Sequence, residues 1–277
     1  VGQGDSKEEG GEQVRRISRG KRAGLGAALG VGAAMAAVPA AQATDYTVTN
    51  LADSGPGSLR DAIDATNVDP VGDRILFQSG LTGTITLEND LTPLDGPVEI
   101  VGPGKDQMKI DGGAENYNSL LETQSDLKVS GITLANGWTD GKGGAISATL
   151  SDVVVENSRL EGNRAGSAGG GISVAAGSLT LRDSEVTGNF SAGDGAGVYV
   201  YYQSAADISD STLSGNKSVT GAGGASLGPS SYGKSKINDS VFEGNTGALG
   251  GGLYAKGGID VDSTLFSGNT AERAGGA

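Results

Sequence analysis

Apolar and polar positions alternate in short segments along residues 127–277, and the same order of segments recurs six times. Each copy has an apolar residue or threonine, two spacer residues and an asparagine, followed by a turn of small residues, a glycine run and a second alternating segment. Alternation with a period of two residues indicates β-strands. Because such short strands cannot bury a face alone, stacked copies must share one core, which predicts a solenoid.

The asparagines set the period of this repeat. Successive asparagines are 27, 26, 27, 29 and 24 residues apart, and a period of roughly 20–50 residues is typical of solenoids, propellers and arrays. Stacked asparagine side chains can hydrogen-bond from coil to coil, which offsets the cost of burying them at a bend. We expect a structural ladder made of Asn136, Asn163, Asn189, Asn216, Asn245 and Asn269.

Residues 44–126 carry less regular strand signals and one helix signal. Ser58 and Asp61 form a capping box, which satisfies backbone N–H groups in the first turn of a helix. Leu59, Ala62, Ile63 and Thr66 then fall on one face. We expect a helix at residues 58–66 that caps the solenoid, because an open end exposes strand edges and core.

The first 43 residues have the order of an export signal. Five basic residues between Arg15 and Arg22 precede an apolar run at 23–40, and Ala41-Gln42-Ala43 closes it. This order predicts a signal peptide cleaved after Ala43, and hence a secreted or cell-surface protein with no transmembrane span in the mature chain. A membrane anchor is the alternative, although Ala and Gly make the run weakly hydrophobic. Arg15-Arg16 leaves twin-arginine export open.

Composition excludes several classes of chemistry. The 277 residues include 50 glycines but neither cysteine nor histidine, which removes disulfides, thiolate nucleophiles, Ser-His-Asp triads and histidine-ligated zinc. The net charge is -13. Residues 1–43 hold six basic and four acidic residues, so the mature chain keeps 14 basic and 29 acidic residues and a charge of -15. An acidic balance disfavours nucleic acid as a partner.

Two stretches resemble known families. Residues 49–63, TNLADSGPGSLRDAI, resemble the N-terminal segment of CSLREA-type secreted β-helix proteins, with Gly57 at the position of the eponymous cysteine and Asp61 at that of the glutamate. Phe242-Glu243-Gly244-Asn245 and Gly143-Gly144-Ala145-Ile146 resemble the FxxN and GGA[ILV] repeats of polymorphic outer-membrane proteins. The resemblance implies an all-β, right-handed parallel β-helix with an N-terminal capping helix. We expect it to span residues 44–277, with irregular coils at 44–126 and regular repeats at 127–277 that are truncated in the sixth copy.

Two rows of side chains are candidate binding sites. The first row has one carboxylate at the same repeat position in successive copies: Asp183, Asp210, Asp239 and Asp262. Stacked carboxylates repel, and a hard cation such as calcium would relieve the repulsion. The alternative is that each aspartate bonds to the backbone of its own turn.

The second candidate row is aromatic. In the segments that follow the glycine runs, Val198 and Leu253 should point inward, so the next residues should point outward. We expect an outer platform for sugar rings made of Tyr199, Tyr201, Tyr202 and Tyr254. The alternative is that these are ordinary surface tyrosines of strands.

These features favour a cell-surface or extracellular scaffold or adhesin that binds polysaccharide or protein along its side. The alternative is a carbohydrate-active enzyme of the pectate-lyase-like type, either a polysaccharide lyase or a glycoside hydrolase. Arg159, Arg164 and Arg182 lie near Asp183 and Asp194 in sequence, yet paired charges on a solvated face are the default, and fold alone does not license an activity. We therefore assign no catalytic residue.

Overall fold

The computed structural model describes residues 42–113, 118–231 and 233–273. The expected export signal at residues 1–43 lies outside this part of the chain except for its last two residues. Within the described part, no helix combines the length and hydropathy needed to cross a membrane.

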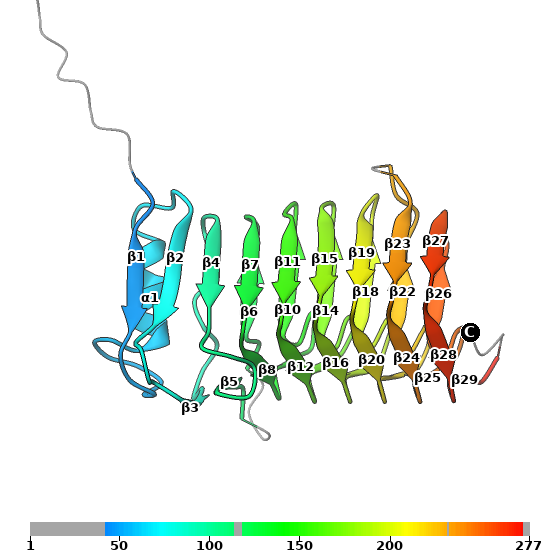
Figure 1. The fold of residues 1–277 in the computed structure, drawn as a ribbon, viewed down its shortest axis with the longest axis horizontal. Coiled ribbons are helices and arrows are strands. Elements are labelled where there is room, and N and C mark those ends of the chain that lie inside the picture. The colour runs from blue at the N-terminus through cyan, green and yellow to red at the C-terminus, as the bar shows by residue number, and fades with distance from the viewer. Residues whose placement is uncertain (1–41, 114–117, 232, 274–277) are drawn as a thin grey trace, which may run out of the picture. The chain divides into compact units, whose positions relative to one another are not determined.

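Four parallel sheets wrap around one core (Figure 1). Sheet A has nine strands, in the order β1 (Asp45–Val48), β2 (Asp73–Phe77), β4 (Val98–Val101), β7 (Leu127–Ser130), β11 (Val153–Glu156), β15 (Ser178–Arg182), β19 (Ala205–Ser209), β23 (Ser235–Asn238) and β27 (Ile259–Asp262). Sheet B has eight strands, β3 (Gly83–Thr86), β5 (Met108–Asp111), β8 (Thr133–Ala135), β12 (Arg159–Glu161), β16 (Glu185–Thr187), β20 (Thr212–Ser214), β24 (Val241–Glu243) and β28 (Leu265–Ser267).

The other two sheets have six strands each. Sheet C contains β6 (Leu121–Thr123), β10 (Ile146–Thr149), β14 (Ile172–Ala175), β18 (Val198–Tyr201), β22 (Ala225–Leu227) and β26 (Leu253–Ala255). Sheet D contains β9 (Trp138–Thr139), β13 (Arg164–Ala165), β17 (Phe190–Ser191), β21 (Lys217–Ser218), β25 (Thr246–Gly247) and β29 (Thr270–Ala271).

One turn of the solenoid visits the sheets in the order A, B, D and C. For example, β7, β8, β9 and β10 follow one another, and β11 then pairs in parallel with β7. Since sheet A gains one strand per turn, its nine strands correspond to about nine turns. The all-β parallel solenoid predicted from the repeat is confirmed.

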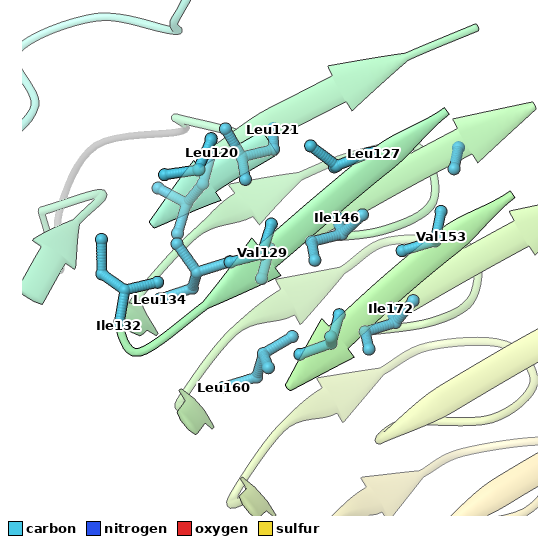
Figure 2. Packing of buried hydrophobic residues seen from close by; sticks show 14 of the residues in the cluster. Leu120, Leu121, Leu127, Val129, Ile132, Leu134, Ile146, Val153, Leu160 and Ile172 are labelled. Atoms are coloured by element: carbon cyan, nitrogen blue, oxygen red, sulfur yellow. The ribbon is translucent and has the colours of Figure 1, made fainter. Parts of the chain in front are cut away.

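The core is a stack of aliphatic side chains in register from coil to coil. Leu121 lies opposite Ile146, which lies opposite Ile172, and all three are at most 2% exposed. Figure 2 shows these residues with Leu134 and Leu160, which face each other from β8 and β12. An interior coil contributes two buried apolar residues from its sheet A strand and one from its sheet B strand, as with Val153, Val155 and Leu160, and their burial depends on the coils on either side.

Helix α1 (Leu59–Thr66) lies beside β1 and β2 (Figure 1). The hydroxyl of Ser58 accepts the Asp61 N–H at 3.1 Å, and the Asp61 carboxylate accepts the Gly57 N–H at 2.8 Å. The apolar face of α1 is buried in the shared core: Leu59, Ala62, Ile63 and Thr66 are at most 6% exposed. The expected helix is present, and its role as a cap of the solenoid stays a prediction.

A continuous row of buried asparagines runs along the corner between sheets B and D. Asn163 donates from Nδ2 to Asn189 Oδ1 at 2.9 Å, and its backbone N–H donates to the same oxygen at 2.9 Å. It also donates to Leu134 O in the preceding coil at 3.1 Å. The same contacts continue through Asn189, Asn216, Asn245 and Asn269. Each interior asparagine thus bridges three coils and leaves no amide hydrogen bond unmade at the corner.

Asn136 is not part of this row, which corrects the expectation that it begins the ladder. Because Leu134 and Ala135 lie opposite Leu160 and Glu161, Gly137 takes the position of Asn163. Its N–H donates to Asn163 Oδ1 at 2.8 Å. A Cβ on Gly137 would lie 2.8 Å from Leu120 Cγ, so no asparagine fits there.

The Asn136 side chain has a different use. Its Nδ2 donates to both carboxylate oxygens of Asp111, at 3.1 and 3.0 Å. With a φ of 55°, Asn136 occupies the left-handed position that Gly162 occupies one coil later. Asparagine and glycine are the residues that tolerate this conformation best.

A second buried row, made of hydroxyl side chains, follows the corner between sheets A and B. The Oγ of Ser184 accepts the Ser158 N–H at 3.1 Å and donates to Arg182 O at 2.7 Å. Ser211, Ser240 and Thr264 repeat this pair of contacts. The four serines are at most 3% exposed. This row satisfies the backbone at a second bend by the same coil-to-coil principle.

The glycine runs let the chain double back tightly after sheet D. A Cβ on Gly144 would lie 2.5 Å from Gly170 O and 2.6 Å from Arg164 O. Both of these atoms belong to the backbone of the next coil, so no side chain fits at this position. The runs therefore serve packing rather than chemistry.

We expect Asn216→Leu to lower the free energy of unfolding by about 3 kcal/mol or more, since it leaves several buried donors and acceptors without partners. The control is Ser214→Ala, which removes only the half-buried hydrogen bond to Thr187 Oγ1 at 3.2 Å and should cost about 1 kcal/mol or less. Thermal and urea denaturation of both variants measures the difference. Equal losses would contradict the role of the asparagine row.

Candidate functional site

The acidic row lies at the exposed corner between sheets A and B. Asp183, Asp210 and Asp239 occupy equivalent left-handed positions with φ of 50°, 50° and 48°. Asp262 does not belong to the row, because it lies opposite Asn238 in the pairing of β23 with β27. Ser263, with φ of 47°, takes the corner position instead. The expected register was therefore one residue off in the last copy.

The left-handed backbone gives these aspartates a structural reason for their positions. Residues with a short polar side chain adopt this conformation far more readily than other non-glycine residues. The same corner holds Gly131 and Asn157 in the preceding copies, and neither carries a charge. Among the described residues, no group of three or more acidic side chains is gathered to hold a metal ion.

Two of the four expected tyrosines form a compact pair on the outer face of sheet C. Tyr199 and Tyr201 alternate with buried Val198 and Val200 along β18. Their rings stack with centroids 4.6 Å apart and an interplanar angle of 15°. The stacking turns one face of each ring toward the other ring, and it restricts both side chains before any ligand arrives.

The other two tyrosines lie apart from this pair. Tyr254 lies opposite Ser226, which lies opposite Tyr199, so two strand steps separate Tyr254 from Tyr199. Tyr202 follows the end of β18 at a left-handed position, where its side chain is 71% exposed. The expected platform is therefore reduced to a pair, with Tyr254 farther along the same face.

A lysine that the sequence did not single out completes the tyrosine pair. Lys142 Nζ lies 4.3 Å from the Tyr201 ring centroid and donates to the Tyr201 hydroxyl at 2.9 Å. It reaches Tyr201 from the loop between β9 and β10, two coils earlier. Burial raises the pKa of the Tyr199 phenol above its ordinary value, and Asp194 and Tyr201 add to the rise. Tyr199 therefore stays a neutral hydrogen-bonding group throughout the physiological range of pH.

Sheet D carries an alternating row of rings and cations on its outer face, which we call the sheet D row. It consists of Trp138, Arg164, Phe190 and Lys217, in register from coil to coil. The Arg164 guanidinium carbon lies 5.3 Å from the Trp138 ring centroid and 4.8 Å from the Phe190 ring centroid. One guanidinium is thus held between two aromatic rings by cation–π attraction.

Sequence reasoning missed this row, although the repeat contains its signal. Arg164, Phe190 and Lys217 each follow directly after an asparagine of the buried row. The strands of sheet D have only two residues each, so they show no alternation that a periodicity argument could detect. Once the asparagine is known to be buried, the next residue but one is also buried, as Ala165 and Ser191 are, and the residue between them must face outward.

The arginines considered at first as catalytic candidates do not gather around Asp183 and Asp194. Arg159 pairs with Glu185 at 2.7 Å and with Asp106 at 3.0 Å, while Arg182 pairs with Glu156 at 3.1 Å. Hydrogen bonds from Arg159 and Lys105 hold the pKa of the Glu185 carboxyl below its ordinary value. These groups are ordinary ion pairs between coils on sheets A and B.

Comparison with known proteins identifies the fold family. A family model described as the right handed beta helix region matches residues 109–271, which is more than half of the chain. The chain belongs to this family. The matched segment begins in β5 and ends in β29, so it includes the asparagine row, the tyrosine pair and the sheet D row.

A likeness to a solved structure is more distant. The chain resembles the PL6 family alginate lyase AlyGC with 14% sequence identity and a TM-score of 0.35. The likeness covers 81% of this chain and 35% of that enzyme, so this chain spans about a third of its length. No curated protein matches the chain.

We expect Asp210→Asn to keep the melting temperature, since asparagine also tolerates a left-handed backbone, and Asp210→Val to cost about 1–2 kcal/mol of unfolding free energy. Melting each variant in EDTA and in millimolar calcium chloride tests whether the acidic row binds calcium or only stabilises the backbone of its turns. A calcium-dependent rise in Tm that Asp210→Asn abolishes would show that the row binds calcium.

Proposed function

We propose that this chain is an exported scaffold, secreted or displayed at the cell surface, that binds glycan along one side of its solenoid. The observation that carries the proposal is the stacked pair of Tyr199 and Tyr201 with Lys142 beside it. The stacked rings offer apolar contact to a sugar ring, and phenol and ammonium groups supply hydrogen bonds to hydroxyls.

The surroundings of the pair support binding rather than turnover. The rings lie on a regular parallel sheet whose strands are fixed in register on both sides. Lys142 bonds to Tyr201 and Asp194 acts on the pKa of Tyr199, and among the described residues no group of three or more carboxylates is gathered to hold a metal. A rigid outer face with a few polar contacts is suited to holding an extended chain.

Sequence features support export and an extracellular setting. The order of basic, apolar and small residues in the first 43 positions is that of a signal peptide. The resemblance of residues 49–63 to CSLREA-type proteins and of the repeats to polymorphic outer-membrane proteins points to the same compartment. A solenoid core without cysteine can supply the stability that other secreted proteins take from disulfides.

We expect Tyr201→Ala to weaken the binding of the best ligand on a glycan array by about fivefold or more, through lost ring contact and the lost partner of Lys142. Tyr202→Ala is the matched control, since Tyr202 lies outside the stacked pair. Titration calorimetry gives both dissociation constants. An unchanged constant for Tyr201→Ala would overturn the proposal, as would steady cleavage of polyuronates in an absorbance assay with calcium present.

A further inference from the structure

The sheet D row differs in charge from the rest of the protein. The full chain has a net charge of -13, yet the outer residues of sheet D are two rings, two cations and two threonines, with no carboxylate. In order along the sheet they are Trp138, Arg164, Phe190, Lys217, Thr246 and Thr270. The strip faces outward, with three exposed and three half-buried residues, and its lack of acidic groups on an acidic protein needs a reason.

Cations on sheets A and B show the contrast. On sheets A and B, most basic side chains pair with a carboxylate one or two coils away, as Lys109 does with Glu161 and Lys128 with Glu99. Arg164 and Lys217 make no ion pair with any described residue, and both are exposed. Acidic partners are plentiful in this composition, so the row keeps two positive charges unneutralised.

The contacts of Arg164 hold it ready for an anion. Its guanidinium lies over the rings of Trp138 and Phe190, which restricts the side chain before any ligand arrives. A guanidinium stacked by its faces keeps its N–H donors at the edge, and their fork geometry matches a carboxylate. Less conformational entropy is then lost on binding.

The spacing of the row favours a polymer over a single small anion. Strands of a sheet lie about 4.8 Å apart, so the two rings are separated by about 10 Å, and so are the two cations. The row therefore consists of two successive pairs, each of one ring and one cation, that follow each other along the solenoid axis. A chain of sugar rings in which carboxylates recur offers a matching succession of apolar faces and negative charges.

We propose that the sheet D row binds a carboxylate-bearing polysaccharide that lies along the solenoid axis. Carboxylates pair with Arg164 and Lys217, and the sugar rings contact the outward edges of Trp138 and Phe190, since the guanidinium of Arg164 lies between the faces of these two rings. The inference rests on the proposed function in assigning glycan binding to this protein, but it concerns a second surface and adds a requirement for negative charge.

The test measures binding of polygalacturonate and of alginate by calorimetry, with fully methyl-esterified polygalacturonate as the neutral probe. We expect the ester to bind at least tenfold more weakly than the acid, and affinity for the acid to fall as salt rises. We expect Arg164→Gln to weaken binding of the acid about tenfold, as loss of one charge-assisted bidentate contact does. Trp138→Ala should weaken binding of the acid severalfold.

Arg182→Gln is the matched control, because it removes the same charge from an exposed arginine that is paired with Glu156 on sheet A. Its affinity should equal that of the unchanged protein, and circular dichroism should show that both variants melt normally. The proposal is overturned if neither polyuronate binds, if the ester binds as well as the acid, or if Arg164→Gln and Arg182→Gln behave alike.

Two further measurements separate this proposal from binding of acidic peptides and from the proposed tyrosine site. Poly-glutamate that binds as tightly as polygalacturonate, and loses affinity with Arg164→Gln, would assign the row to acidic peptides and overturn the glycan assignment. If Tyr201→Ala affects no glycan while Arg164→Gln still does, the proposed tyrosine site fails and the sheet D row stands.

Discussion

Each interior coil of the described solenoid is hydrogen-bonded in parallel to the coil before and the coil after it, so each strand residue faces its own repeat equivalent. This constraint decides which residues can occupy each position. A side chain at a buried corner must be able to bond to a copy of itself. Asparagine meets this condition because it carries both donors and an acceptor, and serine meets it by accepting an N–H while donating to a carbonyl.

The same constraint explains the outer faces of sheets A and B. Identical charges stacked at about 4.8 Å would repel, so the sequence alternates them along a row: Asp45, Arg74, Glu99 and Lys128 are successive neighbours. Arg74 pairs with both acidic neighbours, at 3.5 and 3.3 Å. Each such pair is worth little alone at the surface, but the alternation avoids a repulsion that would otherwise recur in every coil.

Sequence periodicity was sufficient to predict the solenoid and most of the asparagine row. It was wrong where a motif is displaced by one residue, at Asn136 and at Asp262. Backbone geometry fixes the number of residues at each corner. The sequence motif alone cannot distinguish an asparagine in the buried row from one that takes the left-handed position of a glycine. The sheet D row was missed for a related reason. Its strands are too short to alternate, and the contacts of Arg164 join residues that are 26 apart in the chain.

Stacking also separates structural positions from those free to bind ligands. Asparagine, serine and glycine positions are committed to backbone bonding or close packing, so their side chains have no capacity left for a ligand. Outward positions on sheets C and D carry no such duty. There the residues change type from coil to coil, from Ser173 to Tyr199 and from Arg164 to Phe190. Any recognition by this fold must arise from such variable rows, because the repeat itself fixes the rest.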